Sequence, residues 1–316
     1  MAQIAAAVAG SPLTAALLAS ALALLTLLPA VVPAALPLAP AAAAASGASL
    51  TLPLLEGRVR LALAGFGLAL PLLGIGAVLA GADAGTSIAI GMGLWLPCLA
   101  LGLVLERTRS LPLALTLGAL VAVLLLVALR LLAGDWLEML SARQGEAVGA
   151  MLEASVPAQR QAEFEQALAA VARLAAGLLV ASSLLVATLG LLLARFGQAR
   201  LRRPGAFGDE FRALRFGRSA ALVSLLVLGL AVVPGLPVFA EIAMIVGVPM
   251  GLQGLAVMHA LARSAPRWRA GLFMIYLLLG LALLQIGFAL AMLGVLDNWL
   301  DFRRRRGAGH RPHGED

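Results

Sequence analysis

The sequence has few of the groups on which water-soluble enzymes rely. Only 12% of its 316 residues are charged, whereas soluble domains carry about 25%. It contains no lysine, one tyrosine, three histidines and a single cysteine, Cys98. The lack of lysine excludes a Walker-type ATP site, and one cysteine cannot form an intrachain disulfide or a cysteine-based metal cluster. No histidine spacing predicts a zinc site, so we expect no metal and no cofactor.

Apolar sequence is abundant instead. Hydrophobic residues make up 62% of the chain, and the mean hydropathy is +1.00. A soluble core of this size could not cover so much apolar surface, so lipid must cover part of it. The apolar runs are long and rich in leucine, alanine and valine rather than alternating, which favours helices. We therefore predict an all-α fold, a polytopic bundle of transmembrane helices in a bacterial inner (cytoplasmic) membrane.

Nine segments are candidates for membrane spans, and we expect eight or nine of them to cross. The first covers Ser11 to Pro29, and a second runs toward Leu55 after Pro33, Pro37 and Pro40, which would kink a helix. The other seven are residues 61–80, 87–105, 111–133, 168–194, 219–233, 238–262 and 270–296.

Charge separates a transmembrane domain, residues 1–302, from a basic polar tail, residues 303–316. Within the domain, residues 134–167 form the one sizeable polar excursion, with six acids against two arginines. We predict that it is an acidic extracytoplasmic segment, part of it a surface helix, and that a new helix begins at Pro157 and enters the next span.

Arginine clusters between the spans predict the orientation of the chain. They lie at residues 58–60, 107–109 and 195–218, which the positive-inside rule assigns to the cytoplasm together with the N-terminus. The net charge of +7 therefore reflects topology and does not indicate nucleic acid binding. After Arg218, however, three crossings would put Arg303 to Arg306 outside. We expect one segment not to span, and residues 219–233 are the best suspect.

The ionisable residues expected within the membrane are His259 and three charged ones, Arg130, Arg173 and Glu241, with Gln253 and Gln285 as polar neighbours. Charges at this depth are costly and mark functional candidates. On the predicted topology all three lie near the outer ends of their spans. Together they would form a pocket for an anionic or zwitterionic small molecule. The alternative is that each arginine extends to the lipid headgroups and that Glu241 pairs with one of them.

Two further polar residues, Gln253 and His259, share a predicted helix with Glu241. Glu241 and His259 are 18 residues apart, five helical turns, so they lie on one stripe. One hypothesis is a polar relay through Gln253 and His259; the other is a structural histidine close to the water interface.

Small residues recur at helical spacing in two places. Ala15, Ala19 and Ala23 lie in the first span, and Gly287, Ala291 and Gly294 lie in the last. Such spacing allows helices to approach closely, either within the chain or against a partner membrane protein.

Three stretches of the sequence resemble the YybS-like family of bacterial polytopic membrane proteins. They are PGAFGDEFRALRFGR (residues 204–218), QGLAVMH (253–259) and LGVLDNWLDFR (293–303). The resemblance implies a helical membrane domain similar to the substrate-binding subunits of energy-coupling-factor vitamin transporters. In those subunits small residues on an early helix dock a coupling protein, and Ala15, Ala19 and Ala23 are the matching positions.

Two functions are consistent with these features. The first is a small-molecule binding or transport component without its own ATPase, in which Arg130, Arg173 and Glu241 contact the ligand. The second is a structural or assembly factor of the cell envelope that binds other membrane proteins through its small-residue faces, the arginine-rich loop and the tail. We do not expect an enzyme, because no acid, base and nucleophile can be assembled from the residues present.

Overall fold

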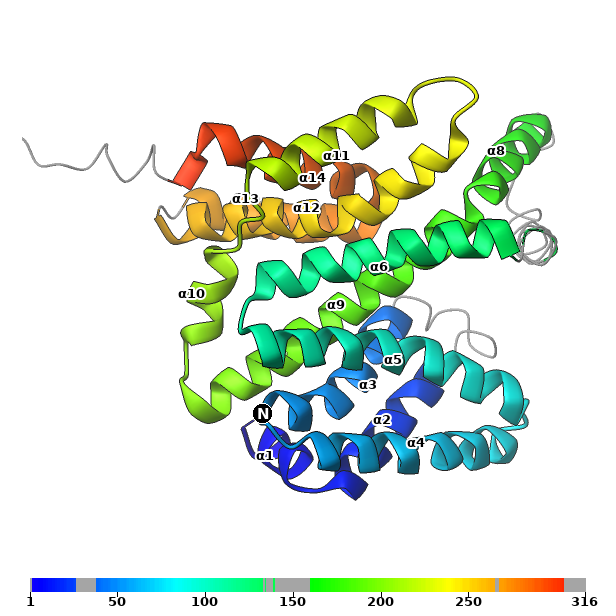
Figure 1. Cartoon of the computed structure of the whole chain (residues 1–316), viewed down its shortest axis with the longest axis vertical. Helices are drawn as coiled ribbons and strands as arrows, with labels where there is room; N and C mark the ends of the chain where they lie inside the picture. Colours follow the sequence, from blue (N-terminus) through cyan, green and yellow to red (C-terminus); the bar gives the residue numbers. More distant parts are fainter. Residues whose placement is uncertain are drawn as a thin grey trace, which may run out of the picture. The chain divides into compact units, whose positions relative to one another are not determined.

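The computed structural model describes residues 2–26, 38–132, 134, 139, 160–264 and 267–303, and in this part of the chain it is all-α (Figure 1). Six helices are long and apolar enough to cross a membrane, as predicted for a multi-pass membrane protein. They are α4 (Val59–Leu79), α5 (Ala84–Thr108), α6 (Leu111–Leu132), α9 (Ala175–Arg202), α12 (Pro237–Ser264) and α14 (Leu283–Leu300).

The other described helices are shorter. α1 (Ala2–Gly10) and α2 (Pro12–Leu25) meet at an angle of 115°, and the Ser11 side chain caps α2 by accepting the N–H of Thr14. α1 and α2 pass the length and hydropathy test only as one bent pair. The remaining ones are α3 (Ala39–Leu55), α8 (Gln161–Arg173), α10 (Ala206–Arg212), α11 (Arg218–Ala231) and α13 (Arg267–Leu281).

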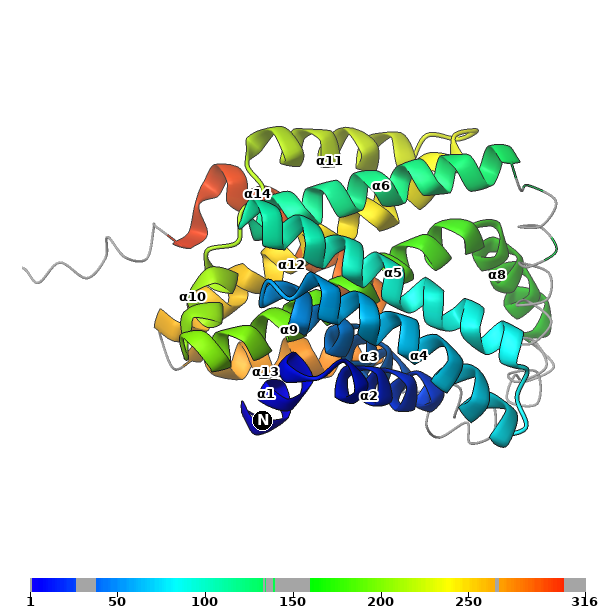
Figure 2. The same cartoon turned by 60° about the horizontal axis from the view of Figure 1, so that its bottom comes forward.

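Contacts group the chain into two compact units. Unit 1 comprises residues 1–118 and 183–215, and unit 2 comprises residues 119–182 and 216–316. In unit 1, helices α2, α3, α4 and α5 pack side by side (Figure 2). In unit 2, α12 packs against α11, α13 and α14.

Helix α3 is the central element of unit 1. It contacts α1, α2, α4 and α5, and most of its side chains are buried. Its small and hydroxyl residues allow this close packing. Ser46 Oγ donates to the carbonyl of Ala19 at 2.7 Å and accepts the indole N–H of Trp95 at 2.7 Å. Hydroxyl-to-backbone bonds between helices therefore hold the interior of unit 1.

The small residues Ala15, Ala19 and Ala23 are buried inside unit 1. Ser49 and Ser46 of α3 donate to the carbonyls of Ala15 and Ala19. This stripe of α2 is therefore covered by helices of the same chain.

Close backbone contact also holds α12 against α14 in unit 2. A Cβ atom added at Gly254 would overlap the carbonyl of Leu290, and one added at Gly294 would overlap the carbonyl of Met250. The spacing of small residues in α14 therefore allows it to pack against α12 within the chain.

The prediction of one long span over residues 270–296 is wrong, because the backbone breaks at Ala282 (φ −145°, ψ 60°). α13 turns back along α12, with Trp268 and Leu272 packed against a buried cluster that includes Leu261. α14 then returns, so that the N–H of Gly217 before α11 donates to Asn298 Oδ1 near the end of α14, at 3.1 Å. The start of α11 and the end of α14 therefore lie at the same end of unit 2.

The predicted span at residues 168–194 is also wrong in its bounds. α8 ends at Arg173, the chain turns at Leu174, and α9 continues from Ala175 as far as Arg202. Pro33, Pro37, Pro157, most of the acidic segment and the tail beyond Arg303 lie outside the described residues.

Candidate functional site

The three predicted membrane charges lie together in unit 2. Arg130, near the C-terminus of α6, donates from Nη2 to Glu241 Oε1 at 2.7 Å and from Nε to Glu241 Oε2 at 3.1 Å. Glu241 lies in the first turns of α12. This parallel two-bond geometry is the strongest form of arginine–carboxylate pairing. Arg130 and Glu241 therefore form a bidentate ion pair between α6 and α12.

The junction between α8 and α9 completes this ion-pair site. The N–H of Gly177 donates to Glu241 Oε1 at 2.9 Å, and Nη2 of Arg130 also donates to the carbonyl of Arg173 at 3.2 Å. Arg173 thus contributes its backbone, whereas its side chain is exposed. Each carboxylate oxygen of Glu241 has at least one donor, which is the condition for burying a charge.

Burial differs sharply between the two partners of the pair. The Glu241 side chain is 1% exposed, and the Arg130 side chain is 40% exposed. The negative charge is therefore inside the protein, whereas the positive charge reaches its surface next to the exposed Arg173.

Gly177 is the residue that lets α9 approach α12 so closely. A Cβ at this position would overlap Cβ and Cα of Glu241. Only glycine leaves room for the N–H to reach the carboxylate without moving the α12 backbone. This glycine was not among the predicted site residues, and its position after two alanines carries no signal in sequence.

A second buried polar cluster in unit 2 joins α12, the end of α14 and the residues before α11. Gln253 is fully buried; its Oε1 accepts the N–H of Phe216 at 3.0 Å, and its Nε2 donates to Asp297 Oδ2 at 3.3 Å. Arg303 Nη2 pairs with the same Asp297 oxygen at 3.2 Å. Asn298 Oδ1 accepts the N–H of Gly217, and Asn298 Nδ2 donates to the carbonyls of Gly294 and Val295 in α14. We name these residues the Gln253 cluster.

Sequence reasoning found Gln253 and overlooked Asp297. Asp297 is fully buried, but it lies near the end of a span, beside polar residues that indicated a membrane interface. The Gln253 cluster joins residues 216–218, 253 and 297–303, which are far apart in the sequence.

His259 contacts α13. Its Nε2 lies 2.7 Å from the hydroxyl of Tyr276 on that helix, whereas Gln253 contacts Phe216 and Asp297. The relay through Gln253 and His259 stays a prediction.

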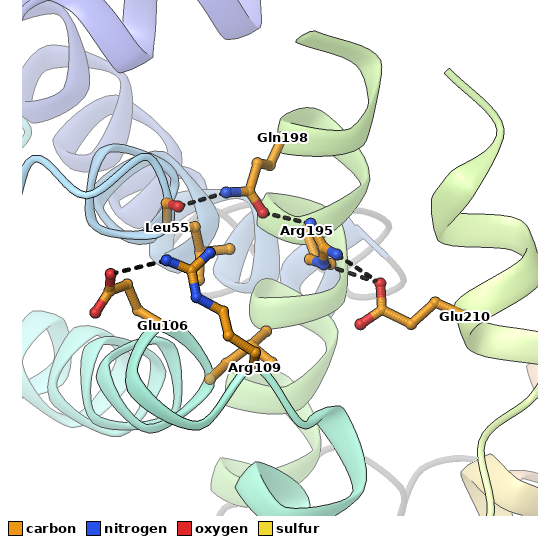
Figure 3. A pocket seen from close by; sticks show the side chains of 7 residues that line it. Leu55, Glu106, Arg109, Arg195, Gln198 and Glu210 are labelled. Carbon is orange, nitrogen blue, oxygen red and sulfur yellow. Dashed lines mark hydrogen bonds and ion pairs between the residues drawn. The ribbon is translucent and has the colours of Figure 1, made fainter. Parts of the chain in front are cut away.

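A pocket of about 50 Å³ in unit 1 is lined by residues of α3, α5, α9 and α10, several of them charged (Figure 3). Arg195 pairs with Glu210 at 2.9 Å, and Arg109 pairs with Glu106 at 3.3 Å. Gln198 donates to the carbonyl of Leu55. Ligand sites for organic molecules measure about 300–1,000 Å³, so this pocket holds water or a small ion at most.

No group of three or more potential metal-binding side chains occurs among the residues that the structure describes. The lone Cys98 is buried next to Thr51 and Gly47. No family model, curated protein or solved structure matches this chain. The function must therefore be inferred from the geometry itself.

Proposed function

We propose that this chain is a small-molecule binding or transport component of a bacterial inner membrane, without its own ATPase, and that its ligand is an anion. The supporting observation is the half-exposed Arg130 guanidinium on a fully buried carboxylate, with the Arg173 side chain exposed beside it. The resemblance to the YybS-like family supports the same class of function.

The chemistry of the site favours a carboxylate or a phosphate as the recognised group. Guanidinium groups bind both in a planar, two-bond geometry. Glu241 already occupies one edge of Arg130, so a ligand would meet the remaining exposed part of Arg130, and the exposed Arg173 side chain adds a second positive charge. Two positive charges disfavour a cation at this surface.

The test is a thermal-shift screen of the protein in lipid nanodiscs against small carboxylates and phosphates, with native mass spectrometry of the hits. Arg173→Gln is the informative variant because its side chain is exposed and its backbone contact survives the change. Arg107→Gln, an exposed arginine at the end of α5, is the matched control.

We expect an anion to raise the melting temperature of the wild type and of Arg107→Gln, but not of Arg173→Gln. If no anion shifts any of them, or if both variants lose the shift equally, the proposal fails. Co-purification of another membrane protein in that case would move the assignment to an assembly factor.

We also propose a topology with ten crossing helices: α2 to α6, α9 and α11 to α14. The hairpin of α13 and α14 adds one crossing to the nine candidate segments, so the C-terminus returns to the side of Arg218 and the charge rule holds throughout. α11 and α13, with 14 and 15 residues, are short for a full span. A reporter fused after Asp316 should report the cytoplasm; a periplasmic signal would contradict this topology.

A further inference from the structure

The residues at the break between α8 and α9 do not by themselves favour a break. Residues 173–176 read Arg-Leu-Ala-Ala, which are among the best helix formers, and contain neither proline nor glycine. The chain nevertheless leaves the helix at Leu174. Breaks of this kind arise where a side chain is inserted into the backbone hydrogen-bond ladder. Tertiary contacts must therefore impose it.

The inserted groups are Arg130 and Glu241. In an uninterrupted helix the N–H of Gly177 would donate to the carbonyl four residues earlier, which belongs to Arg173. Here Arg130 donates to that carbonyl, and Glu241 accepts that N–H. The ion pair thus takes the place of one backbone hydrogen bond and satisfies both of its orphaned ends.

We infer that the α8–α9 junction is a two-state hinge controlled by the Arg130–Glu241 pair. With the pair inserted, the helix is broken at Leu174 and α8 turns away from α9 (Figure 1). With the pair withdrawn, the N–H of Gly177 is buried without an acceptor, and the carbonyl of Arg173 is its natural helical partner. An unsatisfied buried backbone N–H is costly, so the two groups bond to each other and α8 and α9 become one helix.

This hinge rests on the geometry of the pair and not on the proposed anionic ligand. If such a ligand does bind Arg130, it can act on the hinge. An anion that draws Arg130 away from the carbonyl of Arg173 removes one of the two contacts by which the ion pair replaces the backbone hydrogen bond. Ligand binding would then change the direction of α8.

The test measures the distance between spin labels on the two helices in nanodiscs. Glu163→Cys on α8 and Ser182→Cys on α9 are both exposed, and a Cys98→Ala background removes the one native thiol. In a continuous helix these positions are about 28 Å apart, and any bend shortens the distance. The apolar double variant Arg130→Met/Glu241→Leu should lengthen the mean distance toward this limit.

Arg173→Gln is the control, because it removes a charge beside the junction but keeps the carbonyl, and it should leave the distance as in the wild type. If the double variant does not accumulate, Glu241→Gln alone should add a second, longer population. If the double variant gives the same distance distribution as the wild type, the hinge is wrong. If only Glu241→Gln can be measured, an unchanged distribution in that variant leads to the same conclusion.

Discussion

Units 1 and 2 hold their buried polar groups by different means. In unit 1 the bonds between helices in the interior join neutral groups, such as Ser46 with Ala19 and Trp95, and the charged pairs lie at helix ends, including Glu56, whose side chain is 6% exposed, with Arg202. In unit 2 two carboxylates, Glu241 and Asp297, are buried inside the bundle, each with an arginine.

The difference predicts how each unit responds to damage. An interhelical hydrogen bond between neutral groups in a membrane contributes roughly 0.6 kcal/mol on average, because the unfolded chain also finds partners. A buried charge that loses its partner costs about 3–5 kcal/mol. A single substitution of a neutral polar residue in unit 1 should therefore lower the free energy of unfolding only slightly. Removing one partner of a buried ion pair in unit 2 should lower it much more.

The largest expected effect comes from breaking the ion pair unevenly. Arg130→Gln leaves the Glu241 charge buried without a cation and should lower the free energy of unfolding by about 3–5 kcal/mol. Glu241→Gln should cost less, because the half-exposed Arg130 can turn to water. Unfolding in mixed micelles measures both.

The double variant Arg130→Gln/Glu241→Gln should be more stable than Arg130→Gln alone, since no uncompensated charge remains buried. Equal losses of unfolding free energy in the two single variants, or additive losses in the double variant, would show that an unpaired buried charge is not the cause of the destabilisation.

The second-largest expected effect tests the close backbone contact between α12 and α14 in unit 2, which involves no charge. Gly254→Ala places a methyl group on the carbonyl of Leu290 and should destabilise unit 2 by about 1–3 kcal/mol. Gly247→Ala on the same helix and Gly287→Ala on α14 have open space and should be near neutral. A loss equal to that of Gly254→Ala in either control would argue against the close α12–α14 contact.

A smaller effect is expected in unit 1. Ser46→Ala removes one bond to the Ala19 carbonyl and leaves the Trp95 N–H without its acceptor, at a cost of about 1–2 kcal/mol. The same micelle unfolding experiment checks it. A loss as large as that of Arg130→Gln would remove the contrast between the two units.

The smallest effect concerns pH at the start of α5 in unit 1. Thr86 donates its backbone N–H to Asp83, and this holds the pKa of Asp83 below its usual value. A carboxyl with a lowered pKa stabilises the folded state above its unfolded pKa, and this contribution is lost as the pH falls through the lowered value. The melting temperature of Asp83→Asn should therefore fall less than that of the wild type between neutral and strongly acidic pH; parallel curves would contradict this.

Sequence patterns predicted much of the helical architecture and part of the site. The long apolar runs correspond to α4, α5, α6 and α12, because hydropathy over about 20 residues reports burial in lipid directly. Arg130, Arg173 and Glu241 were selected as rare charges in apolar surroundings, and the structure places them together. Sequence alone could not predict that Arg173 contacts Arg130 through its backbone carbonyl and not through its side chain.

The two helix breaks that were not predicted from the sequence have a common origin. The break at Ala282 lies between leucines, so hydropathy is the same for one long helix and for a hairpin. The break at Leu174 is imposed by residues 44 and 67 positions away in the chain. Neither turn contains proline, and local propensity alone continues the helix through both.

The sequence by itself determined that this chain is helical and apolar enough for several membrane crossings, because those properties depend on composition and local periodicity. It also indicated that Arg130 and Glu241 are charges that need a partner, since apolar surroundings make isolated charges costly. Only the tertiary structure decided where helices break and which backbone groups the ion pair satisfies. Those outcomes depend on residues distant in sequence that meet only after the helices have packed.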